Sequence, residues 1–66
     1  MPGVAIGRIV HYVTTDGQEK AAIISDVYHD DVVALHVMDT YGVNVVFQVG
    51  FSEKKAGHTW HWPEKV

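Results

Sequence analysis

Turn-forming residues divide this chain into runs that are long enough for strands and too short for most helices. The turn signals fall at four places: Asp16-Gly17, Asp30-Asp31, Asp39–Gly42 and Lys54–Gly57. Five runs of strand length lie between or beside them: Gly7–Val13, Ala21–Tyr28, Val32–Met38, Val43–Val49 and His58–Trp62. Twelve valines and four isoleucines stand against a single leucine, and β-branched side chains pack well on a pleated sheet. The sequence therefore predicts one all-β domain over residues 1–66, a small five-stranded SH3-like barrel without a long helix.

Alternation of side chains along these runs assigns an inner and an outer face to each strand. The inner face is expected to hold one of Trp60 or Trp62 together with Ile9, Val13, Ile23, Val27, Val33, Leu35, Val37, Val45 and Phe47. The outer face is then unusually apolar, with Val10, Tyr12, Ile24, Tyr28, Ala34, Met38 and Val46. Two explanations stay open: the strong twist of a small barrel buries both faces, or a homo-oligomer, most simply a dimer, covers the second face.

Charge and composition exclude several classes of function. Five basic residues against eight acidic ones give a net charge of −3, which argues against a long nucleic acid as ligand. Val4–Gly7 is too short for a signal peptide core or a membrane span, so a cytoplasmic protein without a membrane partner is expected. The chain has no cysteine, which removes disulfides and thiolate ligands.

Neither a metal site nor a catalytic centre is expected from the spacing of reactive residues. His58 and His61 lie three apart, which points them to opposite faces of a strand, and no His-x-His pair is present. Ser25 and Ser52 lack the flanking glycines of a nucleophile elbow. We therefore predict a protein that is not an enzyme and that needs no cofactor and no metal.

The two ends of the chain carry the densest aromatic, histidine and arginine content. Trp60 and Trp62 lie two apart on one strand face, and Arg8 is the only arginine. Aromatic rings stack on bases or proline rings, and a guanidinium can donate two parallel hydrogen bonds to a phosphate. The expected ligand-binding residues are Arg8, His11, Tyr12, Tyr41, Trp60, His61 and Trp62. The alternative is that both tryptophans only fill the core and that the working surface lies in the middle of the chain.

The same two ends resemble a set of small phage and prophage proteins. The resemblance is carried by Gly7–Val13, Asp16-Gly17, Ser52–Lys55 and Thr59–Glu64, the last reading TWHWPE. His58 is a departure, because the similar sequences run from glycine directly to threonine there. The resemblance implies phage origin and a compact β fold, and it transfers no catalytic residue.

Two functions follow as hypotheses. In the first, the chain is a phage-type binding protein acting in the host cytoplasm, either by sequestering a small nucleotide signal as counter-defence or by occupying a host protein. In the second, it is an SH3-like interaction module that binds a peptide or another phage protein.

Overall fold

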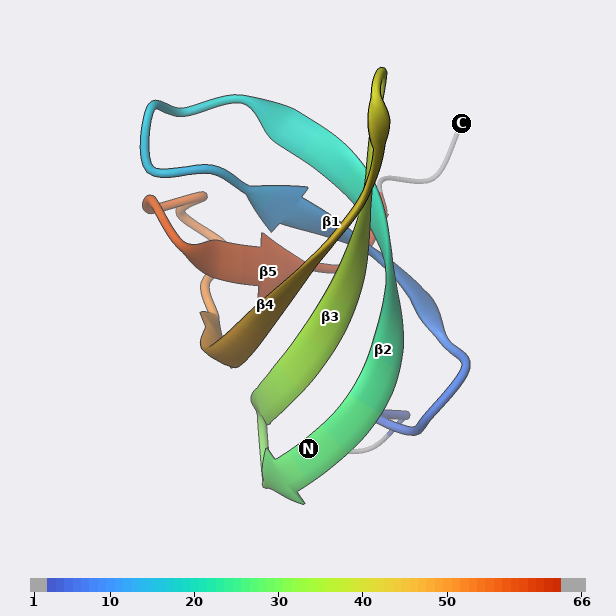
Figure 1. Ribbon diagram of the computed structural model, residues 1–66. Helices are drawn as coiled ribbons and strands as arrows, with labels where there is room; N and C mark the ends of the chain where they lie inside the picture. The colour runs from blue at the N-terminus through green and yellow to red at the C-terminus, as the bar shows by residue number, and fades with distance from the viewer. Residues whose placement is uncertain (1–2, 64–66) are drawn as a thin grey trace.

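The computed structural model describes residues 3–63, which form a closed five-stranded β-barrel (Figure 1). The strands follow each other around the barrel in chain order: β1 (Ile9–Val13), β2 (Glu19–His29), β3 (Val32–Asp39), β4 (Gly42–Phe51) and β5 (Thr59–His61). Neighbours from β1 to β4 are antiparallel, and β5 closes the barrel antiparallel to β1 and parallel to β4. The predicted all-β, five-stranded barrel is confirmed. Within residues 3–63 there is no helix that could cross a membrane.

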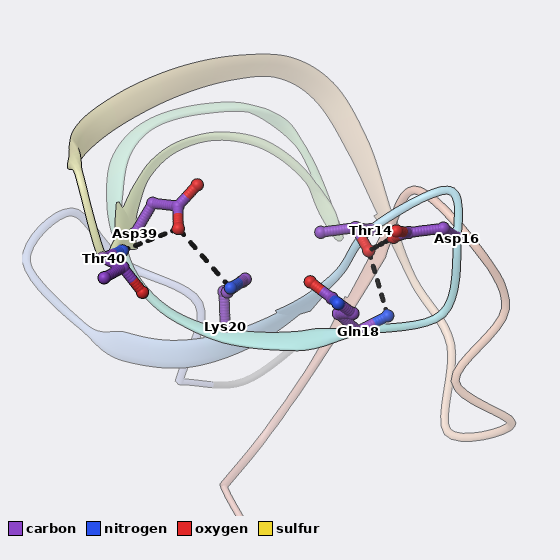
Figure 2. Close-up of polar contacts among 6 residues, drawn as sticks. All are labelled: Thr14, Asp16, Gln18, Lys20, Asp39 and Thr40. Carbon is purple, nitrogen blue, oxygen red and sulfur yellow. Dashed lines mark hydrogen bonds and ion pairs between the residues drawn. The ribbon is translucent and has the colours of Figure 1, made fainter.

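The turn between β1 and β2 forms at the predicted Asp16-Gly17 step. Gly17 has a φ of +92°, in the left-handed region that glycine adopts without steric cost. The Thr14 hydroxyl oxygen accepts the Gln18 N–H at 3.0 Å and its proton is donated to the Asp16 carboxylate (Figure 2). That hydroxyl donor is the main reason why the pKa of Asp16 lies below its ordinary value.

The hairpin between β3 and β4 turns through Thr40 and Tyr41, because Asp39 and Gly42 face each other across its base. The Asp39 carboxylate accepts the Thr40 N–H at 2.6 Å and lies 3.5 Å from the Lys20 ammonium of β2 (Figure 2). This local bond of an aspartate to a following N–H is the usual reason that aspartate favours turns. The ion pair is partly exposed, so we expect its contribution to stability to be small.

Strands β2, β3 and β4 form a strongly curved sheet that wraps around the core (Figure 1). Their ladders slip at three places, between Ile24 and Asp26, between Val27 and His29, and between Val33 and Leu35. Such β-bulges add twist and curvature to a strand, which a barrel of only five strands needs for closure. Bulges therefore decide which face each side chain takes after the slip.

Trp60 lies at the centre of the core and is fully buried. Its indole N–H donates to the Asp31 carbonyl at 2.8 Å, so the ring's one polar group is satisfied inside the barrel. The core cluster around it contains Val10, Tyr12, Ala22, Ile24, Val33, Leu35, Val37 and Val49. Val33, Leu35, Val37 and Trp60 were expected there and are confirmed, and Val13 is buried outside this cluster.

The predicted faces of β1 and of the first half of β2 are wrong, except that Val13 is buried as expected. Val10, Tyr12 and Ile24 point into the core, whereas Ile9 is 60% exposed and Ile23 is only half-buried. Both faces of these strands carry apolar side chains, so alternation alone did not distinguish them. Ala34 is likewise buried, against expectation, and Val27 is half-buried beyond the β2 bulge.

The predicted face of β4 is also wrong over most of its length. Val45 is 45% exposed and Phe47 is 61% exposed, while Val46 packs against the core cluster. Val46 and Val49 both face inward because a bulge at Gln48, which has a φ of +51°, inserts an extra residue between them. The apolar outer surface therefore exists, but it includes Ile9, Val45 and Phe47, which were assigned to the core.

We expect Ile24→Ala and Phe47→Ala to separate the two faces. The Ile24 side chain is fully buried, so its truncation should cost about 2–5 kcal/mol of unfolding free energy. The Phe47 side chain is exposed, so its truncation should lower the unfolding free energy by less than about 1 kcal/mol. Urea unfolding at low protein concentration measures both. A larger loss for Phe47→Ala than for Ile24→Ala would contradict this orientation.

Candidate functional site

Pairing of β1 with β5 brings the first and last strands together (Figure 1). His11 faces His61 across this pair, and Tyr12 faces Trp60. Because side chains alternate along a strand, the two histidines lie on the outer face and the Tyr12–Trp60 pair lies on the inner face. The barrel's closure thus places an aromatic pair on the inner face and two histidines on the outer face, of which His11 is half-exposed and His61 is buried.

An aromatic stack leads from the core to the surface beside β5. The fully buried Trp60 ring meets the Phe51 ring at a centroid distance of 5.0 Å and the Trp62 ring at 5.1 Å, both edge to face. The Arg8 guanidinium carbon lies 5.1 Å from the centroid of Trp62. This cation–π contact holds a positive charge over the outermost ring of the stack.

Next to this stack lies an open pocket of about 190 Å³. Its wall contains the rings of Phe51 and Trp62, the imidazole of His61 and two charged side chains from the loop 52–58, Glu53 and Lys55. The volume is below the roughly 300–1,000 Å³ of drug-sized pockets, so it fits one ring system of a ligand rather than a whole one. The lining combines flat apolar surface with one ammonium donor.

A polar cluster of His11, Glu19 and His61 lies on the outer face of β5, β1 and β2. Glu19 Oε1 is 2.8 Å from His61 Nε2 and 3.5 Å from His11 Nδ1, and Glu19 Oε2 is 3.7 Å from Lys55 Nζ. His61 is only 4% exposed, and its Nδ1 has no partner among the described residues. Partial desolvation works to raise the pKa of Glu19, but His61, Lys55 and His11 together lower it below its ordinary value.

His58 belongs to a separate network at the start of β5. Its Nε2 lies 3.3 Å from the Phe47 carbonyl, which can only accept, so Nε2 carries the proton. His58 Nδ1 is then the acceptor for the Tyr12 hydroxyl at 2.8 Å, and burial raises the pKa of that phenol. The ring therefore ties β1 to β4 beside the closing strand. His58 itself has a φ of +56°, a left-handed conformation that is uncommon outside glycine.

Six of the seven residues expected to bind a ligand come together along β1 and β5. Trp60 is wholly core and offers no surface, and Tyr12 shows 6% of its side chain. Tyr41 stands at the tip of the β3–β4 hairpin with 97% exposure, and the contacts that link the other six do not include it. Of the six that come together, Arg8, His11 and Trp62 are accessible.

Sequence reasoning missed Glu19 and Lys55, and Phe51, although it is a candidate for the flat surface of a groove, is not among the seven expected residues. A signal for Glu19 was present, because a tight turn at Asp16-Gly17 pairs Glu19 with Val13 and so places it on the face of His11. Phe51 reaches the pocket from the end of β4, where it pairs with Trp60, and Lys55 reaches it through the path of the loop 52–58, in which Lys55 has a φ of +59°. Alternation carries no information about such a loop.

No protein-family model matches this chain, and comparisons with curated proteins and with solved structures found no match either. The fold and the side-chain geometry are therefore the basis for the functional argument.

We predict that Glu19 makes the protein sensitive to acid. Its pKa is lowered by folding, so its contribution to stability is present above the unfolded value of 4.5 and is lost as the pH falls through the lower folded value. Glu19→Gln should therefore be less stable than the wild type at neutral pH, with a difference that shrinks below pH 4.5. Urea unfolding across this range measures the difference, and a constant difference at every pH would contradict the assignment.

Proposed function

We propose that this chain is a binding protein without turnover and that it takes a small nucleotide at the pocket beside β5. The observation that carries the proposal is the pairing of flat rings with positive charge: Phe51 and Trp62 line the pocket, Lys55 lies at its wall, and Arg8 covers Trp62. Rings stack on any base through its π-face, and lysine and arginine both bind phosphate.

The energetics of such a site favour moderate affinity. Stacking of a base on an aromatic ring contributes about 1–3 kcal/mol, and a charge-assisted hydrogen bond is about twice as strong as a neutral one. A base between Phe51 and Trp62 with a phosphate at Arg8 or Lys55 would support binding near the micromolar level, which needs about 8 kcal/mol. Glu53 also lines the pocket, and its carboxylate disfavours a phosphate placed deep inside. We therefore place the base in the pocket and the phosphate at its rim.

The resemblance of the two ends to phage proteins sets this chemistry in a biological context. A phage protein that retains a small nucleotide without converting it would remove a host signal from the cytoplasm, which is a form of counter-defence. Alternatively, the same surface binds a host protein directly, and no small ligand is then needed.

Binding is tested by the melting temperature of the chain against a panel of cyclic dinucleotides, cyclic oligonucleotides and cyclic ADP-ribose isomers. A ligand that binds only the folded state stabilises it and so raises the melting temperature. At a ligand concentration a hundred times the Kd, the stabilisation is about 2.7 kcal/mol. We expect at least one member of the panel to do so, and we expect Arg8→Ala and Trp62→Leu to abolish the rise while remaining folded. Lys54→Ala, which changes an exposed lysine of the same loop, is the matched control and should keep the rise. A panel without effect removes the nucleotide proposal.

A second candidate, assembly with another protein chain, is favoured by the outer side of the β3–β4 hairpin. Its exposed apolar side chains are Met38, Tyr41, Val43, Val45 and Phe47. Strand β4 holds no charged residue and no proline, and among residues 3–63 it pairs with β5 only at Gly50 and Phe51. Natural sheet edges are normally protected by charges, prolines or cover, so this edge is suited to pairing with another strand.

The occupant that we propose for this edge is a second copy of the chain. An antiparallel pair of β4 strands related by a two-fold axis would place the same apolar side chains on both sides of one interface. The sequence argument for a homo-oligomer named Val10, Ile24, Met38 and Val46. Val10 and Ile24 lie in the core and Val46 packs against it, so the proposal rests instead on Met38 and the other exposed side chains of the hairpin.

Light scattering at tens of micromolar protein should report twice the 7.4 kDa of one chain. Phe47→Glu should shift the mass to that of a monomer, since it buries a charge in the shared face. Ile6→Glu, which changes an exposed apolar side chain outside the strands, should leave the mass of the dimer unchanged. A wild-type monomer would instead leave the hairpin open to a peptide or another phage protein, as in the interaction-module hypothesis.

A further inference from the structure

The cluster of His11, Glu19 and His61 has the composition of a transition-metal site. Two imidazoles and one carboxylate each offer one ligand atom, and the three atoms all lie within 4.8 Å of one another. We propose that these residues bind one divalent cation of the zinc class and leave one coordination position open. The proposal does not rest on nucleotide binding or on the oligomeric state, although His61 also lines the pocket.

The ligands are set by strand register rather than by loops. His11 and His61 are direct partners in the β1–β5 pair, and Glu19 is the partner of Val13, two residues along β1 from His11. All three side chains therefore leave the same face of three neighbouring strands. Cross-strand partners have Cβ atoms about 4.5–5.5 Å apart and diagonal ones are at about 7–8 Å, within reach of a shared ion. Ligands on paired strands are held more rigidly than ligands on loops.

The distances are close to those that a tetrahedral ion requires. Bonds of about 2.0–2.1 Å to nitrogen and oxygen separate neighbouring ligand atoms by roughly 3.3 Å. Glu19 Oε1 lies 2.8 Å from His61 Nε2 and 3.5 Å from His11 Nδ1, so these pairs straddle that value. Small rotations of the side chains of Glu19 and His11 would admit the ion. His61 is almost fully buried, so its ring stays where packing places it.

The two oxygens of Glu19 have different neighbours. Oε1 faces both imidazoles, and Oε2 faces Lys55 Nζ at 3.7 Å. This division presents one oxygen to the metal, while the ammonium holds the other, in the way that ligating carboxylates are usually oriented by a further contact. The same ammonium repels a cation, and His61 Nδ1 has no acceptor among the described residues. Each of these features weakens binding, so we expect an affinity below that of a structural zinc site.

The ligand set also selects among metals. Imidazole nitrogen suits zinc, cobalt and nickel, whereas calcium and magnesium prefer all-oxygen sites. Three protein ligands leave a fourth position for water or a ligand, as in open zinc sites. Zn²⁺, Co²⁺ and Ni²⁺ should therefore bind, and Mg²⁺ and Ca²⁺ should not.

The test is titration of the whole chain with Co²⁺ or Zn²⁺ and no other ligand. Binding is monitored by visible absorption and by the NMR signals of the imidazole rings. We expect one ion per chain, an absorption band of four-coordinate Co²⁺ that Zn²⁺ displaces, and shifts confined to His11 and His61. His11→Gln and Glu19→Gln should weaken binding at least tenfold. His36→Gln, which changes an exposed histidine of β3, is the matched control and should bind as the wild type does.

His61 is buried, so loss of binding in His61→Gln could reflect unfolding of that variant. His11 is half-exposed, so His11→Gln is the variant that decides the test. The proposal is overturned by the absence of a cobalt band and of NMR shifts. It is equally overturned by binding that survives His11→Gln, or by binding that is lost in His36→Gln.

Discussion

Closure of this barrel depends on a strand of three residues. Strand β5 joins β1 through three residue pairs and β4 through two, and so few pairs cannot hold two sheet edges together by their backbone bonds alone. Packing of Trp60 supplies the remaining stability: its ring is fully buried, and its N–H reaches the Asp31 carbonyl beyond the far end of β2. His58 adds a second tie between β1 and β4 through Tyr12 and the Phe47 carbonyl. The pocket and the histidine cluster both lie beside β5 because closure places them there.

The strands and turns could be predicted because they depend on local chemistry. A valine-rich run favours a strand wherever it lies, and Asp16-Gly17 favours a tight turn for reasons of backbone conformation alone. The inward faces could not be predicted because Val10 and Ile9 are both β-branched and apolar, as are Ile24 and Ile23, so hydrophobicity does not show which of each pair faces the core. Register and bulges decide between them, and a bulge such as that at Gln48 follows from the curvature of the whole barrel.

The candidate site was predictable to the same degree. That the two ends meet follows from the closure of a barrel whose first and last strands are neighbours, and this brought Arg8, His11, His61 and Trp62 into one region. Tyr41 was chosen for its ring alone and stands at a hairpin tip. Lys55 was not chosen, because its place depends on a loop with a left-handed residue rather than on any pattern of side chains.

Lys55 and His61 belong to both the pocket and the cluster on Glu19. The ammonium of Lys55 is held at the Glu19 carboxylate, so its charge is partly neutralised for an anion in the pocket. A cation bound by His11, Glu19 and His61 would compete with the Lys55 ammonium for that carboxylate, so metal binding would change the charge at the pocket wall. Coupling between two binding equilibria is reciprocal, so the factor by which a metal changes anion binding would equal the factor by which the anion changes metal binding. One short strand thus carries the closure of the barrel, part of the pocket wall and one member of the histidine cluster.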